Sequence, residues 1–170
     1  MQNETTKLLH YCKQAYDDDS FQVGFYHYYI ESENLIVIAG SNSFSDWYLF
    51  NLRPFPLNPF HNAFQKLAQK LLNFYSPYID DKTIICGHSA GGCLAFILAE
   101  LSSSTSVSFG SPLLVQRKYV CDSRASHTMY SLKYDPVAYF CNYKSNNIEV
   151  VEVPGVGHRI EKYIKSMYDS

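Results

Sequence analysis

Apolar runs of strand length and amphipathic stretches of helical spacing follow one another along this chain of 170 residues. Phe21–Glu31 and Leu35–Ala39 are predicted to form two strands, joined by a turn at Ser32–Asn34. Thr83–Cys86 has the composition of a short buried strand. From Asn3 to Tyr16 the spacing of apolar residues predicts an amphipathic helix. These patterns indicate a sheet that is flanked by helices.

A further helix is predicted from His61 to Tyr75, and Pro77 is expected to end it, because proline cannot continue a helical hydrogen-bond ladder. Large apolar side chains recur at helical spacing and are expected to form one buried face of this helix: Phe60, Phe64, Leu67, Leu71 and Phe74. Gly92–Leu101 is rich in Ala and Leu and predicts another helix. It follows the Thr83–Cys86 strand after a tight turn.

That turn, Gly87-His88-Ser89-Ala90-Gly91, carries the strongest functional signal in the sequence. A Gly-x-Ser-x-Gly motif between a strand and a helix is typical of a nucleophile elbow, although an ordinary strand-to-helix turn can contain the same residues. An elbow places the serine hydroxyl at a helix N-terminus, where developing negative charge is stabilised. Ser89 is therefore the candidate nucleophile. The backbone N–H of Ala90, the next residue, is a candidate oxyanion-hole donor.

A serine nucleophile needs a histidine that accepts its proton. In α/β sheets that carry a nucleophile elbow, the chain order is serine, acid, histidine. Two histidines follow Ser89. His127 lies at the start of a predicted strand, where we expect a structural role. His158 lies in a loop punctuated by glycines, and loops carry catalytic groups more often than strand interiors do. His158 is therefore the candidate base.

Three carboxylates between the serine and this histidine are candidates for the acid. Glu149 lies in an alternating strand pattern and is expected to face solvent. Asp122 lies in a polar turn. Asp135 directly follows the predicted strand Met129–Tyr134. Because open α/β sheets place their active sites at the carboxyl ends of strands, Asp135 is the candidate acid.

The chain from Leu35 onward resembles the fungal-type, or class 3, lipases in a series of motifs that occur in the same order. They are Val37–Trp47, His61–Phe64, Gly87–Gly92, Ser108–Pro112, Asp135–Val137, and Gly157–His158 with Tyr163. The resemblance implies an α/β-hydrolase-like fold with a mixed, mostly parallel sheet flanked by helices. We expect this fold as a minimal single domain over residues 1–170.

The resemblance also implies that the backbone N–H of Ser41 is the second oxyanion-hole donor, and that the aromatic-rich segment Ser43–Phe60 forms a lid over an acyl-binding cleft. A connector packed on the core is the alternative for this segment. The sequence departs from the family pattern at three positions, with Ala39, Ala63 and Ala90 in place of arginine, glycine and leucine. None of these changes removes a catalytic group. Because only about forty residues precede the Gly40-Ser41 motif and 23 positions separate Asp135 from His158, the sequence resembles a trimmed version of the family.

Composition narrows the function further. A net charge of −2 provides no basic face for nucleic acid, and no apolar run approaches the roughly 20 residues of a membrane-spanning helix. The first residues lack the apolar core of a signal peptide, so an intracellular location is expected. Cys86 and Cys93 have core-like surroundings and are expected to be reduced thiols. No Cys/His spacing indicates zinc, and the chemistry needs no cofactor.

The sequence therefore predicts a serine carboxylic-ester hydrolase, a lipase or esterase, that acts through an acyl-enzyme intermediate on an ester or lipid substrate and makes transient contact with a lipid surface. Thioesterase, phospholipase or amidase chemistry would use the same site. A lipase-like interaction module without catalytic activity is the alternative outside enzymology.

Overall fold

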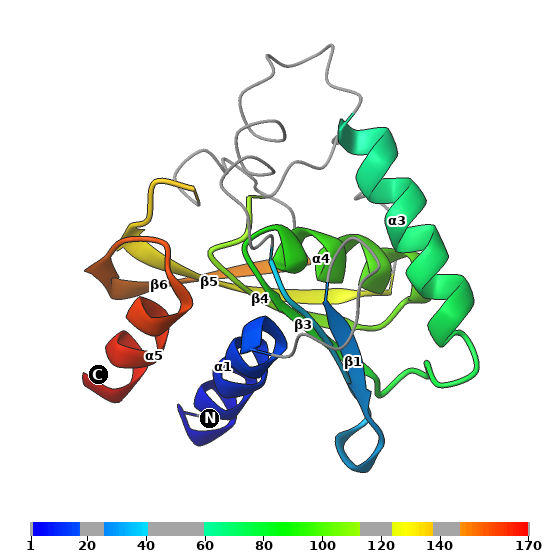
Figure 1. Ribbon diagram of the computed structural model, residues 1–170, viewed down its shortest axis with the longest axis horizontal. Helices are drawn as coiled ribbons and strands as arrows, with labels where there is room; N and C mark the ends of the chain where they lie inside the picture. The colour runs from blue at the N-terminus through cyan, green and yellow to red at the C-terminus, as the bar shows by residue number, and fades with distance from the viewer. Residues whose placement is uncertain (1, 18–25, 41–59, 113–123, 138–146, 170) are drawn as a thin grey trace.

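The computed structural model describes residues 2–17, 26–40, 60–112, 124–137 and 147–169, and shows a mixed six-stranded sheet between two layers of helices (Figure 1). In chain order the helices and strands are α1 (Gln2–Asp17), β1 (His27–Ile30), β2 (Leu35–Ile38), α3 (Phe60–Tyr75), β3 (Ile84–His88), α4 (Ala90–Ser102), β4 (Thr105–Phe109), β5 (Ser126–Tyr134), β6 (Ile148–Val156) and α5 (Ile160–Asp169). The strands lie in the order β1-β2-β3-β4-β5-β6. Strand β1 is antiparallel to β2, and all other neighbours are parallel.

Each face of the sheet has its own apolar core. Helices α1 and α5 pack together on one face, and α3 and α4 pack together on the other. Strand β2 shows why both faces are covered: Leu35 and Val37 belong to the core beneath α1 and α5, whereas Ile36 and Ile38 belong to the core beneath α3 and α4. A strand buried on both faces has a continuous apolar sequence, as a central parallel strand does.

The predicted helices and the central strands are confirmed, and one expected helix face is wrong. In α3 the buried stripe consists of Phe64, Ala68, Leu71 and Tyr75, while the side chain of Phe74 is 60% exposed. The stripe continues from Leu71 by four residues to Tyr75 instead of by three to Phe74. The first predicted strand begins only at His27 within the described residues.

Cys86 and Cys93 are buried thiols that are not joined in a disulfide. None of the helices in the described part of the chain combines the length and the apolar character that crossing a bilayer requires.

The carboxyl ends of the parallel strands lie along one edge of the sheet. Strand β3 leads directly into Ser89, β5 into Asp135, and β6 into the segment that contains His158. Parallel pairing with matched register brings these three strand ends to the same side. The edge is therefore where the candidate site residues can meet.

Candidate active site

Ser89 occupies a strained turn between β3 and α4. Its backbone has φ 56° and ψ −127°, a conformation that non-glycine residues rarely adopt. The N–H of Ser89 still donates to the carbonyl of Phe109 at 2.9 Å, so the turn begins from a paired strand. This geometry is that of a nucleophile elbow, with the serine at the N-terminus of a helix.

The glycines of the motif allow α4 to approach the sheet closely. A Cβ on Gly91 would collide with the carbonyl oxygens of Ile38 and Ala39, at the end of β2, and a Cβ on Gly87 would collide with the backbone of Gly91. Neither neighbour is a flexible side chain that could move away. The Gly-x-Ser-x-Gly spacing is therefore required by backbone packing on both sides of Ser89.

His158 lies between Ser89 and Asp135 and contacts both. Its Nε2 is 2.8 Å from Ser89 Oγ, and its Nδ1 is 2.9 Å from Asp135 Oδ2 and 3.0 Å from Oδ1. Because an ionised carboxylate can only accept, the proton of a neutral imidazole lies on Nδ1, and Nε2 is free to accept the hydroxyl proton of Ser89. The arrangement can therefore move a proton from the serine to the histidine.

Asp135 is almost fully buried and is held ionised by its partners. Its carboxylate accepts from His158, from the hydroxyl of Tyr163 at 2.5 Å and from the N–H of Val137 at 2.8 Å. Burial by itself would raise the pKa of Asp135, but these hydrogen bonds and the attraction to His158 outweigh it and hold the pKa below its ordinary value. Asp135 thus remains a carboxylate throughout the neutral pH range.

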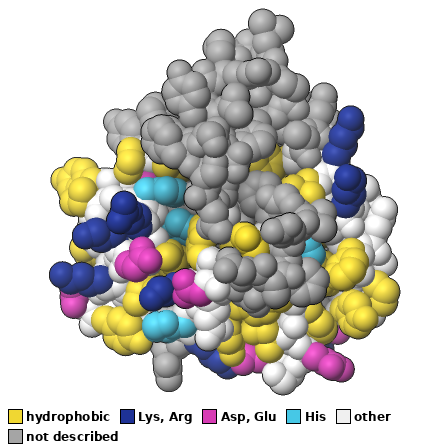
Figure 2. All heavy atoms as spheres, in the orientation of Figure 1, with side chains coloured by type: hydrophobic (Ala, Val, Ile, Leu, Met, Phe, Trp, Pro, Cys, Tyr) yellow, Lys and Arg dark blue, Asp and Glu magenta, His cyan; other side chains and the backbone are white. Residues whose placement is uncertain are grey.

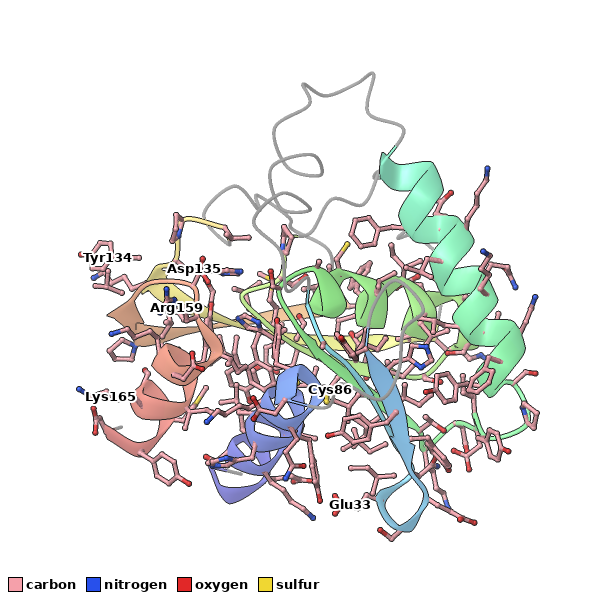
Figure 3. All side chains as sticks on the ribbon, viewed as in Figure 1. Glu33, Cys86, Tyr134, Asp135, Arg159 and Lys165 are labelled. Atoms are coloured by element: carbon pink, nitrogen blue, oxygen red, sulfur yellow. The ribbon has the colours of Figure 1, made fainter. Side chains whose placement is uncertain are left out.

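The loop after β4 fits closely beneath this carboxylate. Gly110 has φ 57°, and a Cβ there would lie 2.7 Å from Asp135 Oδ2 and 2.8 Å from the hydroxyl of Tyr163. The Phe-Gly-x-Pro motif at 109–112 therefore leaves space for the acid and its tyrosine donor. In Figure 3, Asp135 and Arg159, the residue after His158, are labelled on the same side of the sheet, where β5 ends and α5 begins.

The imidazole of His158 is partly accessible, with 21% of its side chain exposed. In the space-filling view, histidine side chains reach the surface just above α5 (Figure 2). The backbone N–H of Ala90 lies in the first turn of α4, where helical donors have no acceptor within the helix. It is available for a negatively charged oxygen near Ser89.

Several residues named in the sequence analysis do not join this arrangement. His127 is buried at the other end of β5, against Ser106 and Glu100, and Glu149 is an exposed residue of β6. Ser41, Asp122 and the segment Ser43–Phe60, apart from Phe60 at the start of α3, lie outside the described residues. Their predicted roles therefore stay predictions.

Two site residues escaped the sequence analysis. In the sequence, His88 is a variable position of the Gly-x-Ser-x-Gly motif, and Tyr16 is part of a predicted amphipathic helix. The hydroxyl of Tyr16 lies 2.7 Å from His88 Nδ1. The sequence offers one signal for Tyr16, its spacing of four residues from Cys12 on the apolar stripe of the predicted helix, and the structure shows both residues packed in the same core.

Among the residues that the structure describes, no group of three or more His, Cys, Asp and Glu side chains is placed to hold a metal ion.

No family model matches the chain, and no curated protein matches it in sequence. Among solved structures it is similar to a triacylglycerol lipase from Penicillium expansum, with 14% identity and a TM-score of 0.47 over 78% of this chain and 64% of that one. The chain thus spans less than two thirds of the length of that lipase.

A second similar structure is a protein described as a predicted CIB-like hydrolase from Thermoplasma acidophilum. It has 12% identity and a TM-score of 0.51, over 78% of this chain and 79% of that one. At such identities the likeness concerns the fold alone. Together with the strand order and the two helical layers, it shows that the chain has an α/β-hydrolase-like fold with a mixed, mostly parallel sheet flanked by helices.

Proposed function

We propose that this protein is a serine carboxylic-ester hydrolase, a lipase or esterase, with Ser89 as the nucleophile, His158 as the base and Asp135 as the group that orients the base. One observation carries the proposal: Ser89 Oγ, the His158 ring and the Asp135 carboxylate form an unbroken hydrogen-bonded line at a strained elbow. A serine hydroxyl becomes an effective nucleophile when a base takes its proton, and a third group that orients this base completes the arrangement.

In the proposed reaction, Ser89 Oγ attacks the ester carbonyl carbon while its proton passes to His158 Nε2. The N–H groups of Ala90 and Ser41 bind the negative charge that develops on the carbonyl oxygen. His158 then gives the proton to the departing alcohol oxygen, and the acyl group remains on Ser89. Water, which loses a proton to His158, attacks this ester. The carboxylic acid leaves, and the proton returns to Ser89.

Asp135 contributes in two ways. Its two oxygens fix the ring of His158 with the proton on Nδ1, and its negative charge stabilises the imidazolium that forms when Ser89 attacks. The hydrogen bonds from Tyr163 and Val137 keep the carboxylate in one orientation.

The ordered motifs of the sequence further support a place among the short relatives of the class 3 lipases, with residues 1–170 as a single domain. The substrate class proposed is accordingly an ester or lipid, which the protein would meet at a lipid surface.

A fluorophosphonate probe tests the proposal directly. We expect the probe to label Ser89, as located by mass spectrometry of the digested adduct, and the wild-type protein to hydrolyse p-nitrophenyl butyrate. Ser89→Ala should lose both properties while retaining the circular-dichroism spectrum of the wild type. A folded wild-type protein that neither labels nor hydrolyses p-nitrophenyl, phospholipid or acyl-thioester substrates would instead support the interaction-module alternative. Preference for a phospholipid or a thioester would reassign the substrate class.

A further inference from the structure

Two side chains that the proposed chemistry does not use, the buried His88 and the partly buried Tyr16, connect the parts of the site. Tyr16 lies in the last turn of α1, and His88 is the last residue of β3, directly before Ser89. The Tyr16 hydroxyl is 2.7 Å from His88 Nδ1, and His88 Nε2 is 2.8 Å from the backbone carbonyl oxygen of His158. At the other end, the N–H of Gly40 donates to the Tyr16 hydroxyl at 2.9 Å.

The chemistry of the two ends fixes the direction of every hydrogen bond in this line. The N–H of Gly40 can only donate, and the carbonyl of His158 can only accept. His88 must therefore carry its proton on Nε2, so that Nδ1 of the neutral ring accepts from the Tyr16 hydroxyl. That hydroxyl donates to His88 and accepts from Gly40. All polar atoms of the line are thus paired in a single, mutually consistent arrangement.

Neither side chain changes its protonation near neutral pH. Burial, together with the neighbouring His158, lowers the pKa of His88 to about 3. Burial also raises the pKa of Tyr16 above its ordinary value, so its hydroxyl keeps the proton that it donates. The line therefore acts as a fixed brace and not as a titrating group.

Packing around the line leaves little freedom to shift. A Cβ on Gly40 would collide with the Tyr16 hydroxyl and would lie 2.8 Å from the carbonyl oxygen of His88. The Tyr16 and His88 rings meet edge to face with centroids 5.7 Å apart. One turn before Tyr16, Cys12 Sγ is 3.7 Å from Cys86 Sγ, and Figure 3 shows Cys86 beside α1. Helix α1 is therefore seated on β3 along its C-terminal half.

We propose that Tyr16 and His88 are positioning residues that hold the backbone of His158 and the end of β2 in one fixed relation. The inference rests on the proposed function. Gly40 directly precedes Ser41, the predicted second oxyanion-hole donor, and the carbonyl of His158 belongs to the proposed base. The brace thus links the group that removes the proton to the segment that leads to the oxyanion hole. Neither Tyr16 nor His88 is required to touch the substrate.

Such a hydrogen-bonded line would contribute to catalysis by keeping the distances between the catalytic groups fixed. A displacement of about 1 Å between catalytic groups can reduce the rate about 100-fold, because the reacting atoms must meet at close to contact distance. Loss of the Tyr16 hydroxyl removes one donor and one acceptor at once and leaves the N–H of Gly40 and Nδ1 of His88 without their partner.

Tyr16→Phe is the first test, because it removes only the hydroxyl. We expect kcat for p-nitrophenyl butyrate to fall about 10- to 100-fold, with KM changed less than about twofold, and the rate of fluorophosphonate labelling at Ser89 to fall in parallel. Tyr11→Phe is the matched control. Tyr11 lies on the same helix and donates to Glu33 at 2.6 Å, away from the line, so its variant should keep the wild-type kcat.

A double-mutant cycle tests whether Tyr16 acts through His88. The amide of His88→Gln can still donate to the carbonyl of His158, as Nε2 does, but it lacks the Nδ1 acceptor. In that background Tyr16→Phe should cost less than about threefold in kcat, because its partner is already absent. Effects of Tyr16→Phe that are equal in both backgrounds would overturn the inference. If His88→Gln does not fold, the comparison of kcat between Tyr16→Phe and Tyr11→Phe decides whether Tyr16 is a positioning residue.

The outcomes separate this inference from the proposed function. A wild-type protein that neither labels nor hydrolyses contradicts the proposed function, on which the inference depends. A wild type that is active, with a Tyr16→Phe variant of equal kcat per folded molecule, overturns the inference alone. The same holds if Tyr16→Phe lowers only the melting temperature, since Tyr16 would then serve merely to pack α1.

Discussion

The part of the chain that the structure describes contains two clusters of serine, histidine and carboxylate, at opposite ends of the parallel strands. The candidate site joins Ser89, His158 and Asp135 beyond the carboxyl ends. The second, which we call the amino-end cluster, consists of Ser106 on β4, His127 on β5 and Glu100 on α4, with Ser106 Oγ and Glu100 Oε1 each 2.6 Å from a ring nitrogen of His127. Side-chain chemistry alone does not distinguish the two.

The backbone distinguishes them. Ser106 lies inside β4, which is paired on both sides, so the surrounding N–H groups are used by the sheet. Ser89 follows the end of its strand with φ 56°, and the first turn of α4 supplies N–H donors beside it. An oxyanion could be stabilised at Ser89 but not at Ser106.

Access differs as well. The His158 side chain is 21% exposed, whereas that of His127 is 2% exposed and packs against Phe96, with ring centroids 4.1 Å apart and the ring planes tilted by 35°. A buried and satisfied cluster of this kind contributes to folding specificity or stability. Three residue types within hydrogen-bond reach therefore do not suffice, and the elbow, the helix terminus and access to the imidazole distinguish the candidate site.

The largest expected difference is at the serines. Ser89→Ala should lower kcat for ester hydrolysis on the order of 10⁶-fold, because the covalent nucleophile is lost. Ser106→Ala should keep kcat within about twofold, while losing about 1–2 kcal/mol of unfolding free energy for the unpaired Nδ1 of His127. Steady-state kinetics and urea unfolding of both variants measure this contrast. A large activity loss in Ser106→Ala would contradict the distinction.

Substitutions of the two carboxylates, Asp135 and Glu100, should show the next largest difference in kcat. Asp135→Asn should lower kcat about 10⁴-fold, since an amide favours the wrong tautomer of His158, as in the serine-protease precedent. Glu100→Gln should leave kcat near the wild-type value and lower the melting temperature by roughly 2–4 °C for each kcal/mol lost. Kinetics combined with calorimetry test the pair. Equal activity of Asp135→Asn and wild type would reject Asp135 as the orienting acid.

Each of the two carboxylates accepts a hydrogen bond from a further side chain. Removal of these two donors should have a smaller effect on kcat. Tyr163 donates to Asp135 at 2.5 Å, and Asn147 Nδ2 donates to Glu100 at 3.1 Å. Tyr163→Phe should reduce kcat about 10-fold, because one hydrogen bond to the buried carboxylate is lost. Asn147→Ser should leave kcat unchanged. Equal kcat values of the two variants would show that Tyr163 contributes to packing and that its hydrogen bond to Asp135 does not affect catalysis.

The elements that could be predicted from the sequence are those with a clear pattern of apolar residues or with glycines that mark a turn. A continuous apolar run identified β2, and glycines on both sides of Ser89 marked the turn between β3 and α4. The chain order serine, acid, histidine selected three residues that the structure brings within hydrogen-bond distance. These inferences depend on local pattern or on the common edge of parallel strands, which topology guarantees.

What escaped prediction depends on tertiary packing. Tyr16 and His88 are 72 positions apart, and they meet only because α1 crosses the end of β3. No spacing rule encodes that crossing. The face of α3 was wrong for a related reason: Phe74 and Tyr75 are both aromatic, and only the sheet beneath the helix decides which of them is buried.

The smallest expected difference concerns pH. Burial lowers the pKa of His127 below its ordinary 6.5, against the opposing effect of Glu100, so the native state excludes a proton that the unfolded chain binds. The contribution of His127 to the unfolding free energy should therefore be constant above about pH 6.5 and fall below it, by up to about 1.4 kcal/mol per pH unit, in addition to a slope of the same sign from His88. His127→Gln should reduce that slope between pH 7 and pH 5 in urea unfolding. Ser106→Ala, which is destabilised but retains the imidazole, should keep most of it, and an unchanged slope in His127→Gln would show that the amino-end cluster does not exclude the proton.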